Sequence, residues 1–170
     1  MAFHNITLAM DLSLSQPGFA ILATEENGRG VAPIILEKSF VKTNANKSHG
    51  YRLGEISEEI DRYILEYNPE YYVREKGFSR FPNVTQTLFK VVGISDLYAW
   101  MRAEKEIHEI AVTSVKKLVA GSGKASKDDV QKAVIERLQI EQADFFSNDD
   151  ESDAAATALA FYIQKGIIDK

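Results

Sequence analysis

Apolar and polar positions divide the first quarter of the chain into three short apolar runs that are separated by turn residues. β-branched and other apolar side chains dominate each run, and the first run ends at Asp11. Pro17-Gly18 and residues 25–28 mark the turns between the runs. Connections this short favour adjacent antiparallel strands, so the pattern predicts a meander of three strands. The predicted strands are residues 3–10, 18–24 and 32–41.

The apolar positions then take up a helical period, with apolar side chains three or four residues apart from Leu53 to Tyr67. Two more strands and four more helices follow Asn68-Pro69. The last helix is rich in alanine and apolar on nearly all sides, which predicts a buried position. The predicted strands are residues 71–75 and 107–112, and the predicted helices are residues 53–67, 83–103, 114–120, 127–138 and 150–164.

This order of elements predicts the α/β class and a single domain over residues 1–170. We expect a five-stranded mixed sheet in which three antiparallel strands are followed by parallel strands, joined by helical crossovers, with helices on both faces. Of the 170 residues, 45% are hydrophobic and 26% are charged. That composition suits one folded domain and excludes intrinsic disorder.

The sequence contains no cysteine, which excludes disulfide scaffolds, thiolate zinc sites and cysteine nucleophiles. The first residues carry no basic leader and Asp11 interrupts their apolar stretch, so a signal peptide is not expected. No apolar run reaches the ~20 residues that a membrane span requires. We therefore expect a cytoplasmic protein with no membrane partner.

The net charge of −5 argues at first against a nucleic-acid partner. The charges are unevenly distributed, however. Basic residues outnumber acidic ones in residues 71–90 and 111–137, whereas residues 141–153 hold six acidic side chains and no lysine or arginine. The net charge is therefore a poor guide to the partner of this chain.

Acidic side chains occupy the ends of elements that the predicted fold brings together. Asp11 ends the first strand and Glu75 ends the fourth. Asp150 and Asp153 lie three residues apart, on one face, at the start of the last helix. If the first and fourth strands are neighbours, their carboxyl ends face this helix and form a cluster of oxygen ligands. Such a cluster suits Mg²⁺, and four carboxylates around two metal ions can support in-line attack on a phosphodiester.

Each of these acids also has a purely structural interpretation. Asp11 could begin a turn, and Glu75 could form a surface ion pair with Arg74 or Lys76. The acids of residues 149–153 could cap the last helix and interact with its dipole. The metal site becomes the more specific interpretation when the four acids are considered together with the strand order.

The segment GSGKASKDDV, residues 121–130, joins two predicted helices and carries Lys124 and Lys127. It is not a Walker A loop, because the first glycine and the final Ser or Thr of that motif are replaced. Gly121 is expected to end one helix, and Ser126 is expected to cap the next one together with Asp129. The two lysines can then contact a phosphate backbone and stabilise charge at the scissile phosphate.

Two aromatic rings, Phe78 and Phe81, alternate with Lys76 and Arg80 in the segment KGFSRFPN, directly after Glu75. Rings in such a polar loop can stack on an unpaired base. They can also fold back as a lid over the core. Both interpretations stay open for the first ring, and the lid is favoured for the second.

Four segments resemble the RuvC family of Holliday junction resolvases, which belongs to the ribonuclease H-like superfamily. They are LAMDLS, YYVREKGF, SVKKLVAGSGKASKDDV and DDESDAAATALA, and the resemblance covers nearly the whole chain. It implies a ribonuclease H-like fold, with metal-binding and catalytic roles for four acids. These are Asp11, Glu75, Asp150 and Asp153, and Lys127 is expected to act beside them in catalysis.

The resemblance also implies phosphate contacts by Lys116 and Lys127 and a DNA-contacting ring at Phe78. Together with the other bases of the two basic segments, these give the expected DNA-binding residues. They are Lys76, Phe78, Arg80, Lys116, Lys117, Lys124 and Lys127.

The implied protein is a homodimeric, Mg²⁺-dependent endonuclease that cuts four-way junctions and other branched DNA. Two Mg²⁺ ions per active site are expected, with Mn²⁺ as an alternative ion. A two-fold dimer suits a substrate that itself has two-fold symmetry. Trp100, on the predicted helix 83–103, is expected in the core or at the subunit interface.

The sequence departs from the pattern of bacterial members after the first acid, where Leu12-Ser13 replace the usual Pro-Gly. This departure resembles divergent phage-encoded members. It leaves open the cleavage-sequence preference, the selectivity for four-way junctions and the use of a branch-migration motor. Asp149 and Glu151 remain alternatives to Asp150 as the fourth ligand.

Three other functions remain open. Asp11-Leu12-Ser13 with Gly18 also resembles the first phosphate motif of actin-like kinases and ATPases, but their second phosphate loop and adenosine motif are missing here. A related ribonuclease of the same fold is the second alternative. A junction-binding protein without catalytic activity is the third, and the four acids argue against it because a pure binder gains nothing from acids beside DNA.

Overall fold

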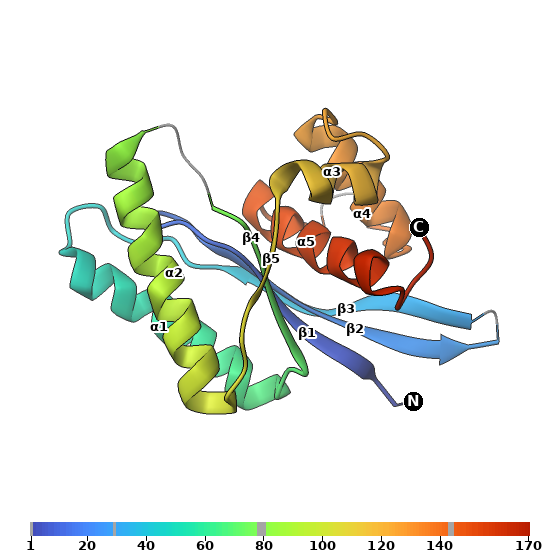
Figure 1. The fold of residues 1–170 in the computed structure, drawn as a ribbon, viewed down its shortest axis with the longest axis horizontal. Coiled ribbons are helices and arrows are strands. Elements are labelled where there is room, and N and C mark those ends of the chain that lie inside the picture. The colour runs from blue at the N-terminus through green and yellow to red at the C-terminus, as the bar shows by residue number, and fades with distance from the viewer. Residues whose placement is uncertain (1, 29, 78–80, 143–144) are drawn as a thin grey trace.

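One mixed β-sheet forms the centre of the molecule in the computed structural model, which describes residues 2–28, 30–77, 81–142 and 145–170 (Figure 1). The strand order is β3-β2-β1-β4-β5. β1 pairs antiparallel with β2, and β2 with β3, whereas β1–β4 and β4–β5 are parallel. The predicted five-stranded mixed sheet is confirmed. Its strands are β1 His4–Asp11, β2 Gly18–Asn27, β3 Gly30–Phe40, β4 Tyr71–Glu75 and β5 His108–Ile110.

Helices cover both faces of this sheet, as predicted (Figure 1). Alternate strand residues point to opposite faces, so each strand contributes to two cores. Ala9 and Val73 pack with the last three helices, whereas Leu8 and Tyr72 pack with the first two. The face of Leu8 and Tyr72 is covered by α1 His49–Tyr67 and α2 Pro82–Ala103. The face of Ala9 and Val73 is covered by α3 Val112–Ala120, α4 Lys127–Arg137 and α5 Asp149–Lys165.

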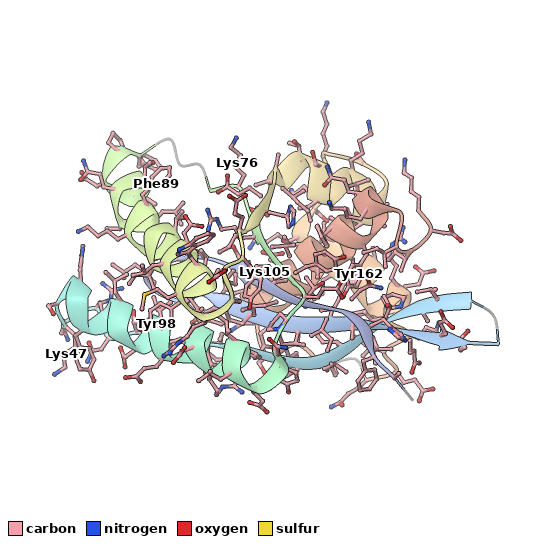
Figure 2. The ribbon with its side chains drawn as sticks, turned by 60° about the horizontal axis from the view of Figure 1, so that its bottom comes forward. Lys47, Lys76, Phe89, Tyr98, Lys105 and Tyr162 are labelled. Carbon is pink, nitrogen blue, oxygen red and sulfur yellow. The ribbon has the colours of Figure 1, made fainter. Side chains whose placement is uncertain are left out.

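Helix α5 is buried against the sheet, in agreement with its apolar sequence. Eleven of its seventeen residues are buried, and five of these are alanines, whose small side chains let the helix lie close to the strands. At its far end the Tyr162 hydroxyl donates a hydrogen bond of 2.6 Å to the carbonyl oxygen of Asn5 (Figure 2). α5 is therefore fixed along its length to the strand that ends in Asp11. No helix of the described residues is long and apolar enough to span a bilayer.

The structure corrects three element boundaries. β2 and β3 continue as a paired ribbon through Glu25 and Glu26 to Asn27 opposite Gly30, so the turn is shorter than residues 25–28. β5 ends at Ile110, and the following residues begin α3 instead of extending the strand. α1 begins at His49, before the first periodic apolar residue, because the Ser48 side chain caps it.

Candidate active site

The two strand-end acids lie side by side at one edge of the sheet. β1 and β4 run parallel with Met10 opposite Arg74, so the next residues, Asp11 and Glu75, follow at neighbouring strand ends. Both lie two residues beyond Ala9 and Val73, which pack under α5. The pleat therefore turns both carboxylates toward the face that α5 covers.

A cavity of about 250 Å³ joins these acids to the last helix and to the basic region. Its charged lining residues come from five different elements. Val112, Val115, Val130 and Ala156 form its apolar wall. The charged residues are Asp11 of β1, Glu75 of β4, Lys116 of α3, Lys127 of α4 and Asp153 of α5. The structure thus brings together three of the four predicted acids with two of the predicted lysines.

The carboxylates of this cavity are partly buried and repel one another. Burial, followed by the charges of Glu75, Asp153 and Asp150, raises the pKa of Asp11 to about 8. Burial and the charge of Asp153 raise the pKa of Glu75 to about 7, against the opposing effect of the lysines. The pKa of Asp153 is also raised, mainly by burial. Shifts of this kind cluster at functional sites, and here they indicate negative charge that the surrounding protein leaves uncompensated.

This donor set fits a hard divalent cation. The carboxylates supply only oxygen ligands, which Mg²⁺ prefers, and a cation would offset the repulsion that raises their pKa values. Among the described residues, no three Asp, Glu, His or Cys side chains already surround one point closely enough to hold an ion. An ion bound here would therefore complete its coordination with water and phosphate oxygens, as Mg²⁺ commonly does.

Asp150 lies at the border of the cavity and does not line it. Its Oδ2 accepts a hydrogen bond of 2.7 Å from Nε2 of Gln16, in the loop after β1. Its charge still reaches Asp11, whose pKa it raises. Asp150 is thus near the cluster but held by a neighbour.

The two alternatives to Asp150 are placed differently. Glu151 is buried, and its Oε2 lies 2.9 Å from Nζ of Lys38 and accepts a hydrogen bond from the Ser147 amide at 2.8 Å. Its carboxylate is therefore used to fix α5 to β3. Asp149 is exposed, 3.7 Å from Lys127.

The surface ion pair considered for Glu75 is not formed. Arg74 points to the opposite face of the sheet, as the pleat requires for adjacent residues. It is buried there, with Nη2 3.0 Å from Glu109 Oε1 and Nη1 donating 2.9 Å to Ser95 Oγ. Within the part of the chain that the structure describes, Glu75 has no ion-pair partner.

Two lysines reach the acids. Lys127 Nζ lies 3.3 Å from Asp153 Oδ2. Burial lowers the pKa of Lys127, but the charge and hydrogen bond of Asp153 outweigh burial and raise it, so the ammonium is retained. Lys116 lines the cavity and donates a hydrogen bond of 2.8 Å to the Ala125 carbonyl oxygen.

The helix ends around these lysines follow the sequence prediction. Gly121 ends α3 in the left-handed conformation, with φ of 80°, and Ser126 and Asp129 form the capping box of α4. This turn presents Lys127 toward the acids. Lys76, Lys117 and Lys124 are exposed and do not line the cavity.

Two of the predicted DNA contacts, Phe78 and Arg80, lie outside the described residues. Phe81 is 69% exposed, so the lid over the core that was favoured for this ring is wrong. Trp100 is not in the core either, because it is exposed on α2.

A second cavity of about 350 Å³ adjoins the first and shares Asp11 and Glu75 with it. It lies toward α2, whereas the first lies toward α3 and α4. Its remaining wall consists of residues 12–15 after β1, Gly77, and the side chains Val84, Thr87, Leu88 and Val92 of α2. The acids therefore face open space on both sides.

Two residues near the acids carry no local sequence signal. Gln16 and Lys38 act on α5 from 134 and 113 residues away along the chain. Neither belongs to a motif or to a periodic pattern. Only knowledge of how α5 lies across β2 and β3 identifies them.

Comparison with known proteins agrees with this geometry. The sequence profile of the family described as crossover junction endodeoxyribonuclease RuvC matches residues 7–161. The RuvC protein of Prochlorococcus marinus subsp. pastoris is 30% identical over 159 residues, which cover 94% of this chain and 97% of that protein.

Two solved structures have the same fold. Thermus thermophilus RuvC in complex with Holliday junction substrate superposes with a TM-score of 0.83 at 23% identity, over 96% of this chain and 97% of that chain. The yeast mitochondrial Holliday junction resolvase Ydc2 gives a TM-score of 0.63 at 14% identity, over 92% and 78% of the two chains. On the family match and the identity to its members, this chain belongs to the RuvC family of crossover junction endodeoxyribonucleases.

Proposed function

We propose that residues 1–170 form one nuclease domain that resolves four-way DNA junctions by metal-dependent hydrolysis of phosphodiester bonds. The observation that carries this function is the convergence of Asp11, Glu75 and Asp153 with two lysines in one cavity. Membership of the RuvC family supports the substrate class, and an actin-like kinase fragment is not consistent with it.

Asp11, Glu75, Asp150 and Asp153 are the residues that would hold the metal. Two Mg²⁺ ions, with Mn²⁺ as an alternative, would activate the attacking water and stabilise the departing oxygen. The raised pKa values of Asp11 and Glu75 support this assignment, because the cavity is short of positive charge. Gln16 orients Asp150 through the hydrogen bond to its Oδ2.

Lys127 and Lys116 supply fixed positive charge at the same place. Lys127 is held beside Asp153 and remains protonated, so it can stabilise the charge that develops on the scissile phosphate. Lys116 lines the same cavity and can contact a phosphate oxygen. The exposed Lys76, Lys117 and Lys124 extend this charge outward and would contact the DNA backbone. Phe78 and Arg80 remain predicted DNA contacts.

The proposed protein is a homodimer that uses α2 as its interface. Phe89, Leu97 and Met101 repeat at four- and eight-residue intervals on this helix and are exposed, as is Trp100. Gly93 lies in the same stripe, and a Cβ there would meet nothing within 4 Å in the described structure, so a second helix could approach closely. A two-fold dimer would present two active sites to the two opposing strands of a junction.

A direct test uses a labelled synthetic four-way junction, a three-way junction and a linear duplex, each with and without Mg²⁺. Symmetric nicks in the four-way junction that require the metal are the expected result. Binding of the junction without any nick, in Mg²⁺ or in Mn²⁺, would instead support the non-catalytic alternative. Cleavage of RNA in preference to the junction would support the related ribonuclease.

A further inference from the structure

The helices α1 and α2 run in the same direction, with their first turns at the same end. Lys90 Nζ of α2 lies 3.0 Å from His49 Nδ1 of α1, and farther along Arg102 Nε lies 2.6 Å from Asp61 Oδ1. Both contacts join residues that are 41 positions apart. The two helices therefore stay aligned over several turns.

Charge is segregated along this helix pair. Residues 41–54 and 82–95, which include the first turns of both helices, contain no acidic residue. The acids of both helices come later, in residues 55–66 and at Asp96. The arginines beside them, Arg62 and Arg102, are paired with these acids.

Helix stability does not explain this distribution. A helix dipole favours acidic side chains in the first turn and basic ones in the last. α1 and α2 have no acid in the first turn, and α1 has no base in its last turn. The first-turn end of the helix pair therefore carries positive charge that no acidic side chain of either first turn opposes.

The lysines at this end are available to such a partner. Lys42, Lys47 and Lys90 are exposed, and none forms an ion pair with a carboxylate of the described residues. Lys47 lies over the ring of Tyr51, 5.3 Å from its centroid, and that ring is also exposed. Unpaired cations gathered in a chain of net charge −5 indicate a surface for binding anions.

This surface is attached to the active site. The amides of Val41 and Thr43 donate hydrogen bonds of 3.0 Å to the carbonyl oxygens of Pro17 and Ser15, in the loop after Asp11. The buried Arg52 fixes the same segment, with Nε donating to Thr43 Oγ1 at 2.9 Å.

The second cavity completes the connection. It runs from Asp11 and Glu75 to Thr87, which lies one helical turn before Lys90. Figure 1 shows the first turns of α2 on one side of the end of β4 and α3 with α4 on the other. The acids thus lie between two separate basic regions.

We propose that Lys42, Lys47, His49 and Lys90 form a second backbone-binding surface, which takes the phosphates of a duplex arm of the DNA whose scissile strand lies on the acids. We name these four residues the arm surface. This inference rests on the proposed function, because it requires a branched DNA on the active site. The lysines would bind the phosphates of the DNA backbone and would not distinguish one base sequence from another.

The experiment measures binding of a labelled four-way junction by fluorescence anisotropy over a series of salt concentrations. The parent protein is Glu75→Gln, so that the junction stays uncut. The test variant adds Lys42→Ala, Lys47→Ala and Lys90→Ala. The control variant adds Lys105→Ala, Lys165→Ala and Lys170→Ala instead, which change the net charge equally. Figure 2 shows Lys47 at the first-turn end of α1 and Lys105 near the opposite end of α2.

We expect the test variant to bind at least about tenfold more weakly at 0.1 M salt. The slope of log K against log salt should fall by about 2 to 3, since each lost phosphate contact contributes about 0.9. The control variant should keep the Kd and slope of the parent. The melting temperatures of all three proteins should agree, because the substituted lysines are exposed.

Two outcomes overturn the arm surface. One is a test variant with the Kd and slope of the parent. The other is an equal loss of affinity in the control variant, which would show that the effect depends only on net charge. Failure of the proposed function looks different, because the parent itself would then bind the four-way junction no better than a linear duplex.

Discussion

Gly18 of β2 lies against Asp150 of α5 so closely that no side chain fits between them. A Cβ on Gly18 would lie 2.8 Å from the Asp150 Cβ and would overlap its carbonyl oxygen. Gly18 is also the partner of Asp11 in the β1–β2 ladder. This one glycine therefore sets how near the first turn of α5 comes to the end of β1.

Replacing this glycine should disturb the site. Gly18→Ala is expected to push the start of α5 outward, to destabilise the fold by about 1–3 kcal/mol and to lower the rate of junction cleavage. Gly54→Ala is the matched control, because a Cβ there meets nothing within 4 Å and alanine favours the α1 helix. Urea unfolding and a nicking assay measure both. Full activity of Gly18→Ala would show that the approach of α5 is not critical.

The carboxylates should be needed for cleavage and not for binding. Glu75→Gln and Asp153→Asn are expected to abolish Mg²⁺-dependent nicking. The junction Kd should stay within about threefold of the wild-type value, because losing a negative charge adds no repulsion of the DNA phosphates. The exposed Glu58 lies in the middle of α1 and lines neither cavity, so Glu58→Gln serves as control. Metal-dependent nicking that persisted in both site variants would refute the assignment.

Asp11 should reduce the stability of the metal-free protein as pH rises. Its folded pKa of about 8 exceeds the unfolded value near 3.8, so the folded state binds the extra proton between these values. The free energy of unfolding then falls as pH increases through this window. Asp11→Asn removes this loss and should raise the melting temperature at pH 8 without metal.

Added Mg²⁺ should favour the wild type over Asp11→Asn, which is the reverse of the difference in melting temperature expected without metal. It should raise the melting temperature of the wild type, because the ion binds only the folded state, and have little effect on Asp11→Asn. Thermal unfolding at pH 5 and pH 8, with and without Mg²⁺, provides all four comparisons. A wild type that gained stability between pH 5 and pH 8 without metal would contradict the burial of an ionisable Asp11.

Substitutions of Lys127 and Lys124 should affect different steps, although the two lysines are only three residues apart. Lys127→Ala is expected to lower kcat at saturating junction by about 100-fold, because it removes a charge held beside Asp153. Lys124 is exposed and outside the cavity, so Lys124→Ala should raise Kd and leave kcat nearly unchanged. Single-turnover kinetics separate the two effects. Unchanged kcat in Lys127→Ala would assign this lysine to positioning of the DNA.

The apolar face of α2 should hold the dimer together. Trp100→Glu places a charge on that face and is expected to shift the protein from dimer to monomer in sedimentation equilibrium. Val31→Glu, at another exposed apolar residue near the β2–β3 turn, should leave the association state unchanged. A wild-type protein that is monomeric in this measurement would contradict the proposal that α2 is a dimer interface.

The sequence was sufficient to predict where the acids meet, because that depends on local pattern and on strand order. Asp11 and Glu75 end neighbouring parallel strands, and the alternation of a strand places Arg74 on the opposite face. The buried helix α5 and the capping box of α4 were likewise visible in residue spacing. Each element was predicted from residues that are close together in the chain, and the connections between the elements then gave the strand order.

The fourth acid was not predictable in the same way. Asp149, Asp150 and Glu151 are equivalent as sequence, and the difference between them arises from contacts with distant strands. Lys38 engages Glu151, and Gln16 engages Asp150. Long-range side-chain contacts of this kind have no periodic signature, so they appear only when the packing of α5 is known.

Helix α5 carries Asp150 and Asp153 and is at the same time the most buried helix of the described fold. A substitution almost anywhere on it would affect folding before it affected chemistry, so variation there is strongly constrained. The segment between α3 and α4 is mostly exposed, although Ala125 is buried in the core. Its exposed side chains, Lys124 among them, can therefore be exchanged at little cost to folding, whereas those of α5 cannot.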